Sequence, residues 1–145
     1  MKTFFAACLL AAAVVPVHAS VDEAPGPARA IALAQKAAPA PVKGVFEMDI
    51  KAVGHDRGQI YLNSEDDYRS KDNLSIHLLP SAEAELKRTL AVADLDETLK
   101  GRRIRVDGKV RQVKIWFLEN GVKTDRFYYQ THVLVRDADQ IRFIR

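Results

Sequence analysis

The chain has 145 residues, a single cysteine and a formal net charge of +3. One cysteine excludes both an intrachain disulfide framework and a cysteine-rich zinc site, so the fold must be stabilised by its core. The length suffices for one such core, and the small net charge does not by itself indicate a polyanionic partner.

Residues 1–19 have the pattern of a secretory signal peptide. Lys2 precedes an apolar run from Phe4 to Val17, and the run ends in the small residue Ala19, which predicts cleavage after Ala19. The run is too short to span a bilayer, which takes about 20 apolar residues. We therefore expect a mature chain without a transmembrane segment, in the bacterial periplasm or secreted.

Residues 20–41 are rich in Ala and Pro and contain few bulky apolar side chains. Such a composition does not build a core and is typical of a flexible leader, in which Arg29 to Ala38 favours a short helix. The sequence then predicts one domain over residues 42–145.

Alternation of apolar and polar residues predicts three short strands at the start of this domain. They cover Val45–Val53, Gln59–Asn63 and Leu74–Leu79, and are separated by a turn at Gly54–Gly58 and a polar loop at Ser64–Asn73. A helix follows Pro80, because Ala82, Leu86 and Leu90 recur at a four-residue spacing that gives one apolar stripe.

A long bent strand begins near Arg102. Ile104, Val106 and Val110 share one parity, whereas Val113, Ile115 and Phe117 share the other, which predicts a β-bulge near Arg111-Gln112. Gly108 is a second device by which a strand turns a barrel corner. Asn120-Gly121 predicts a tight hairpin, followed by strands over Arg126–Val135 and Gln140–Ile144.

Three strands, a helix, a bent strand and its partner follow each other in the order of an OB fold. The segments at 58–79, 99–110 and 133–144 resemble the strand-two/three hairpin, the fourth strand and the closing strand of small OB-fold domains of exported bacterial proteins. The rhythm Leu-x-Gly-x-x-Ile-x-Val-x-Gly at residues 99–108 carries most of this resemblance, which extends over nearly all of residues 42–145. It implies a mainly β fold, a five-stranded OB-fold barrel with a helix between strands three and four. OB folds bind oligonucleotides or oligosaccharides on strands two and three.

Basic residues are concentrated in the strand-rich end of the chain. Residues 20–100 hold 10 Lys and Arg against 14 Asp and Glu, whereas residues 101–145 hold 11 against 5. With the expected bulge, one outward row of cations ends at an aromatic ring, and further tyrosines lie on the second strand and across the hairpin. This candidate ligand-binding set is Tyr61, Arg103, Arg105, Lys109, Arg111, Lys114, Trp116, Tyr128 and Tyr129.

Cations beside exposed rings suit an anionic ligand such as single-stranded nucleic acid, an acidic glycan or an acidic protein, because phosphates meet Arg and Lys while bases stack on rings. The competing interpretation is a solvated barrel exterior whose rings are packed. We expect no catalytic residues, metal site or cofactor, since the histidines lack a ligand spacing and no nucleophile or phosphate-loop motif occurs.

The sequence thus predicts a non-enzymatic binding module and leaves its oligomeric state open. One alternative is a structural or partner-binding envelope protein, and a weaker one is a degenerate relative of the thermonuclease-like enzymes.

Overall fold

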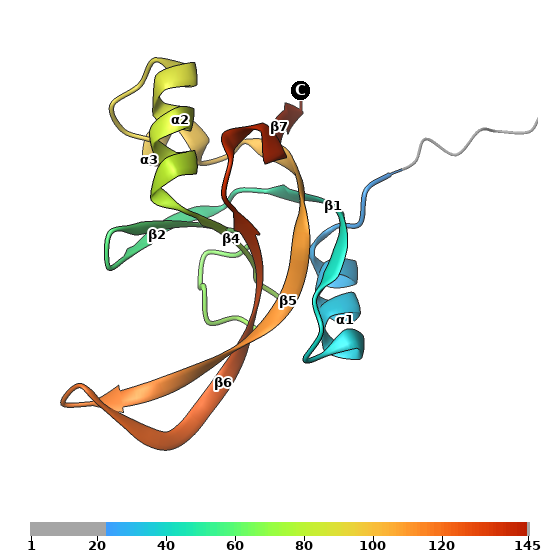
Figure 1. Ribbon diagram of the computed structural model, residues 1–145, viewed down its shortest axis with the longest axis vertical. Helices are drawn as coiled ribbons and strands as arrows, with labels where there is room; N and C mark the ends of the chain where they lie inside the picture. Colours follow the sequence, from blue (N-terminus) through green and yellow to red (C-terminus); the bar gives the residue numbers. More distant parts are fainter. Residues whose placement is uncertain (1–22, 145) are drawn as a thin grey trace, which may run out of the picture.

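The protein is mainly β, and the computed structural model describes its residues 23–144 (Figure 1). The strands are β1 (Val42–Asp49), β2 (Ala52–Asp56), β3 (Gln59–Asn63), β4 (Leu74–Leu78), β5 (Arg103–Glu119), β6 (Val122–Val135) and β7 (Ile141–Ile144). The helices are α1 (Pro27–Ala37), α2 (Pro80–Leu90), α3 (Asp96–Leu99) and a 3-10 turn at Ala138–Gln140. The predicted signal peptide, residues 1–19, lies outside the described residues. Within residues 23–144, no helix is long and apolar enough to cross a membrane.

The strands described form one sheet of seven, in the hydrogen-bonded order β1-β5-β6-β4-β3-β2, with β7 paired to β5. All pairs are antiparallel except β4 with β6, which run parallel. A parallel pair needs a long crossover connection, and the chain supplies it through α2, α3 and β5. The expected five-stranded closed barrel is not confirmed, because the sheet has seven strands and its path of six ends at β1 and β2.

The predicted first strand is in fact two strands, because the chain bends at Ile50-Lys51. The Ile50 amide donates to the Arg102 carbonyl at 2.8 Å, and the Lys51 amide donates to the Asn63 carbonyl at 2.9 Å. Two consecutive amides therefore bond to different segments, one to the residue before β5 and the other to the last residue of β3. The predicted turn at Gly54–Gly58 is shorter than expected, since β2 continues to Asp56 and only Arg57 and Gly58 adopt a positive φ.

The helix after β4 and the hairpin after β5 are confirmed. Ala82 and Leu86 of α2 are buried, and Leu90 packs against the same core. Asn120 and Gly121 both have a positive φ, as a tight two-residue hairpin turn requires. Figure 1 shows α2 and α3 at one end of the molecule and the hairpin of β5 and β6 projecting at the opposite end.

The prediction that residues 20–41 form a flexible leader outside the core is wrong for α1. Ala30, Ile31 and Ala34 lie on one helix face and are buried, and α1 packs against β1 and β5. Alanine side chains let the helix approach the strands closely, so a segment with few bulky residues still covers the core. Composition does not indicate this packing, because small alanine side chains do not by themselves suggest a buried helix face.

The predicted bulge near Arg111-Gln112 is also wrong. The pairing of β5 with β6 is continuous from Val110 to Trp116, and the register shifts only between Trp116 and Leu118. The bend of β5 is instead accompanied by a change of partner, since β5 pairs with β1 up to Val110 and with β6 from Val110 onward.

Gly108 lies where the two halves of the sheet meet, and we expect Gly108→Ala to lower the free energy of unfolding by about 1–3 kcal/mol. A Cβ at this position would lie 2.6 Å from Cγ1 of the buried Val133, so the core would have to shift. Urea unfolding measures the change. Gly26→Ala is the matched control, because nothing lies within 4 Å of its Cβ position. Equal stability of the two variants would contradict this expectation.

Candidate functional site

The side of β3, β4 and β6 that faces away from the core carries a cluster of aromatic and polar side chains. Side chains alternate along a strand, so Ile60, Leu62 and Ile76 point into the core while their neighbours point outward. Cross-strand pairing continues this face onto β5 at Arg111, which lies opposite His132. We call it the outer face; its residues are Gln59, Tyr61, His77, Arg111, Tyr128, Gln130 and His132.

Three rings form the centre of the outer face. Tyr61 and His77 are cross-strand partners and stack with ring centroids 4.5 Å apart. The ring of His132 lies 5.9 Å from that of Tyr61 and 6.4 Å from that of His77. His132 is buried, so the half-buried rings of Tyr61 and His77 are the part of this cluster that a planar ligand can reach.

Glutamine side chains determine the tautomer of both imidazoles. His77 Nε2 contacts Gln59 Oε1, and His132 Nε2 lies 2.7 Å from Gln130 Oε1. An amide oxygen only accepts, so Nε2 of each ring must carry a proton. Gln130 in turn donates from Nε2 to the Tyr128 hydroxyl at 2.9 Å, which extends the network along β6.

Burial keeps the two imidazoles neutral at pH 7. Burial, together with the neighbouring His77 and Arg111, lowers the pKa of His132 to about 4. The pKa of His77 is lowered by burial and by the charge of Arg111. At neutral pH, Arg111 therefore supplies the positive charge beside the rings.

The loop between β3 and β4, residues 64–73, is held against this face by a buried polar network. Asn73 donates from Nδ2 to Asn63 Oδ1 at 3.0 Å, and its Oδ1 accepts from the Glu65 amide at 3.1 Å. Ser75 and Ser64 complete the network by bonding to Asn63 Oδ1 and to the Leu74 amide. Among the described residues, no buried side-chain polar atom lacks a partner. The hydrogen bonds of this network therefore hold the loop in one position against the strands.

The far ends of β5 and β6 form a two-stranded arm, which we define as residues 113–119 and 122–130. β1 pairs with β5 only as far as Val110, and β4 pairs with β6 only from Thr131 onward, so within the arm each strand has the other as partner. The arm exposes several large apolar side chains, namely Phe117, Leu118, Val122, Phe127 and Tyr129. Exposed apolar residues gathered in this way are typical of an interaction surface.

The continuous register divides the predicted cationic row between two faces. Without a bulge at residue 111 or 112, Arg111 lies on the outer face, whereas Lys114 and Trp116 lie on the opposite face of the arm. There Lys114 Nζ lies 3.9 Å from the ring centre of Phe127 and 4.7 Å from that of Trp116. Tyr129 is the cross-strand partner of Lys114 and joins this second group, while Tyr128 points to the outer face.

Arg103 and Arg105 both form ion pairs with Glu47. Their Nε atoms lie 2.5 and 2.7 Å from the two carboxylate oxygens of Glu47, whose side chain is only 7% exposed. Hydrogen bonds from Arg105 and then Arg103 lower the pKa of Glu47 against the opposing effect of burial. These two cations therefore neutralise a buried carboxylate. Of the predicted cations on this side of β5, Lys109 and Arg111 are the ones that do not pair with Glu47.

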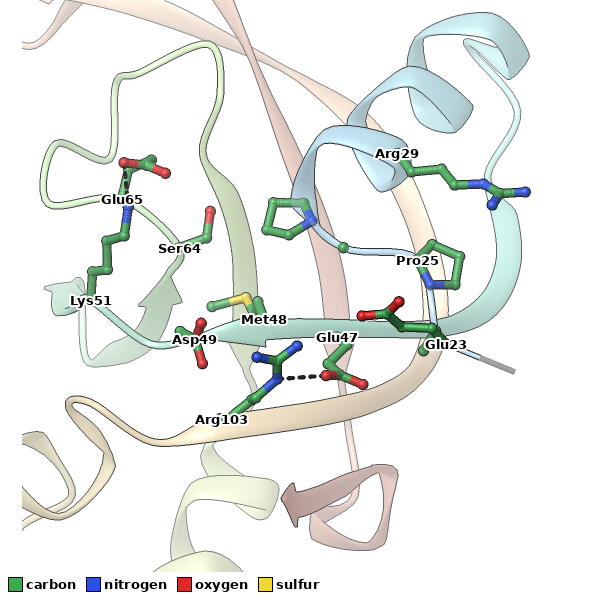
Figure 2. A pocket seen from close by; sticks show the side chains of 13 residues that line it. Glu23, Pro25, Arg29, Glu47, Met48, Asp49, Lys51, Ser64, Glu65 and Arg103 are labelled. Carbon is green, nitrogen blue, oxygen red and sulfur yellow. Dashed lines mark hydrogen bonds and ion pairs between the residues drawn. The ribbon is translucent and has the colours of Figure 1, made fainter. Parts of the chain in front are cut away.

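Figure 2 shows the pocket of about 480 Å³ that Arg103 and Glu47 line, between the chain before α1 and β1. Its charged side chains also include Glu65 and Lys51, which pair at 2.9 Å. Glu23, Arg29 and Asp49 line it as well, so these paired side chains are only part of the charge in the pocket. Within residues 23–144, no three His, Cys, Asp or Glu side chains gather closely enough to hold a metal ion.

Sequence reasoning placed Tyr61 on a ligand face but missed His77, His132 and the two glutamines. The alternation of apolar and polar residues does indicate that Tyr61 and His77 point outward from their strands. It does not indicate that His132 lies beside them, because that depends on the parallel pairing of β4 and β6.

The chain matches no protein-family model and no curated protein. The function is therefore inferred from the residues and their geometry.

Proposed function

We propose that the protein is a non-enzymatic binding module whose outer face takes an anionic ligand, with single-stranded nucleic acid as the ligand. The observation that carries the proposal is the stacked pair Tyr61 and His77 beside His132 and the cation Arg111. Base stacking on such rings contributes about 1–3 kcal/mol per base, and arginine neutralises phosphate.

We also propose that the sheet is an OB-type barrel. Support comes from the parallel pairing of β4 with β6, the helix α2 between β4 and β5, and the two residues that join β1 to β2. If β1 and β2 count as one bent strand, the outer face lies on strands two and three, where OB folds bind their ligands. The sequence of residues 1–19 supports a location in the bacterial periplasm.

Fluorescence anisotropy with an oligothymidine of about ten nucleotides tests the function. We expect micromolar binding at about 25 mM salt that weakens about tenfold at about 150 mM, since two neutralised phosphates give a slope of about −1.4. Arg111→Gln should reduce both affinity and slope. Arg88→Gln is the matched control, because its side chain is 76% exposed and α2, which carries it, lies at the end of the molecule away from the arm.

No binding of the oligonucleotide at low salt would overturn the proposal. Equal slopes for Arg111→Gln and Arg88→Gln would place the ligand elsewhere and refute the outer face as its site. Tyr61→Ala separates stacking from charge, because it should weaken binding of oligothymidine while leaving the salt slope unchanged.

The exposed arm favours a second candidate, docking of another envelope protein. Leu118 and Val122 near the hairpin tip are 49% and 68% exposed, and neither stacking nor phosphate binding requires them. Replacing both by Thr should leave oligothymidine binding unchanged, whereas a partner captured through the arm would be lost.

A further inference from the structure

Where the arm meets the β3–β4 loop, the guanidinium of Arg69 is hydrogen-bonded to the Tyr68 hydroxyl and lies close enough to Tyr128 to act on its hydroxyl. Arg69 Nε donates to the Tyr68 hydroxyl at 3.1 Å. A guanidinium has no acceptor, so Tyr68 must accept in this bond and its own proton points elsewhere. Tyr68 is 47% exposed, which leaves that proton accessible to a ligand.

Tyr128 is oriented in the same way by a different partner. Gln130 Oε1 is occupied by His132 Nε2–H, so the amide nitrogen of Gln130 faces the Tyr128 hydroxyl and donates to it. Tyr128 therefore also accepts, and its proton is available as a donor. Each hydroxyl thus keeps an O–H that can donate, although the two tyrosines come from a loop and from a strand far away in the sequence.

Arg69 brings a positive charge to both hydroxyls. Its guanidinium carbon lies 5.1 Å from the centre of the Tyr68 ring. Burial raises the pKa of Tyr128, and the charge of Arg69 and a hydrogen bond from it act in the opposite direction. The loop that carries Arg69 is fixed by Asn73, which also donates to the Tyr68 carbonyl at 3.4 Å. The three groups are consequently preorganised instead of assembling on a mobile loop.

We propose that Tyr68, Arg69 and Tyr128 form a subsite for one phosphate group, in which two hydroxyls and a guanidinium donate to its non-bridging oxygens. This inference deepens the proposed function and rests on it for the source of the phosphate, a phosphodiester of the bound strand. The subsite lies at the arm end of the outer face, and the hydrogen-bonded chain Tyr128–Gln130–His132 connects it to the ring cluster. A strand whose base stacks on Tyr61 would place a flanking phosphate there.

Asp67 limits the strength of this subsite. Its carboxylate accepts from the Arg69 amide at 2.9 Å and so supports the turn, but it also places a negative charge near the phosphate. Asp67→Asn keeps the acceptor oxygen and removes the charge. We expect this variant to bind oligothymidine more tightly than the wild type, by about twofold to fivefold.

The test uses the double variant Tyr68→Phe/Tyr128→Phe, which keeps both rings and removes both donors. Anisotropy should show oligothymidine binding about tenfold weaker than for the wild type, and Arg69→Gln should lower the salt slope by about 0.7. Tyr129→Phe is the matched control, since its hydroxyl lies on the opposite face of β6, and it should bind like the wild type. Thermal melts verify that each variant is folded.

A second titration distinguishes failure of the subsite from failure of the proposed function. Inorganic phosphate is added to ¹⁵N-labelled protein while the Arg69 Nε–H signal and the amides of residues 65–72 are followed. Saturable shifts in the wild type that are absent from the double variant support the subsite, even if no form binds oligothymidine and the proposed function fails. If the double variant binds oligothymidine as well as Tyr129→Phe does, the subsite is refuted while the proposed function stands.

Discussion

Replacing Asn73 by alanine should lower the free energy of unfolding by about 3 kcal/mol, the largest loss we expect from a single polar substitution. Asn73 is 3% exposed, and its side-chain amide hydrogen-bonds to four partners, namely Asn63, Ser64, Glu65 and Tyr68. Its removal leaves buried donors and acceptors unsatisfied, and each costs about 1–3 kcal/mol. Urea unfolding at neutral pH measures the effect.

Asp72→Asn is the control for this expectation, because it alters the neighbouring exposed position of the same loop and should change stability by less than about 0.5 kcal/mol. Asn73→Ala should also weaken phosphate binding, since the loop that holds Tyr68 and Arg69 loses its anchor. A variant as stable as Asp72→Asn would show that the buried network does not hold the loop.

The second large effect is a loss of stability in mild acid that originates at His132. Its pKa is about 4 in the folded protein and 6.5 when unperturbed, because burial and the adjacent His77 and Arg111 oppose protonation. The unfolded chain therefore binds a proton below pH 6.5 that the folded chain accepts only near pH 4. The free energy of unfolding falls as the pH decreases through this window, by about 3 kcal/mol in all.

His132→Asn removes this titration, so its stability should depend less on pH between about 6.5 and 4 than that of the wild type. Urea unfolding at several pH values across the window measures the difference. Glu47 acts in a lower range, because its lowered pKa makes its contribution disappear only below the usual 4.5. His77→Asn should flatten the profile less, since His77 is less deeply buried. A His132→Asn profile that parallels the wild type would contradict the assignment.

Local sequence signals predicted most of the strands and helices in their order along the chain. Asn120-Gly121 predicted the hairpin, and Pro80 with the stripe of Ala82 and Leu86 predicted α2, because these elements depend on turn chemistry and periodicity within a few residues. α1 was misjudged as part of a leader because its burial depends on a close approach to β1 and β5, which composition does not report.

The candidate site was harder to predict, because it depends on register. The apolar parity of β5 switches after Val110, and a bulge was the local explanation for that switch. The structure shows instead that β5 extends past the core with its register unchanged. Lys114 and Trp116 therefore lie on the same face as the core residues of β5 but outside the core, and Val113 and Ile115 lie on the outer face. No local pattern could place His132 beside His77, since the two residues are 55 positions apart and their strands pair in parallel only after a crossover.

The central claim is that an anionic strand binds along the outer face of β3, β4 and β6. Mapping backbone amide shifts of ¹⁵N-labelled protein during titration with oligothymidine tests it most directly. We expect saturable shifts in β3, in β4, around Arg111, in the β3–β4 loop and from Tyr128 to His132. Helix α2 and the part of the Figure 2 pocket formed by β1 and the chain before α1 should be unaffected. Shifts confined to that pocket, or to the Lys114–Trp116 side of the arm, would contradict the claim.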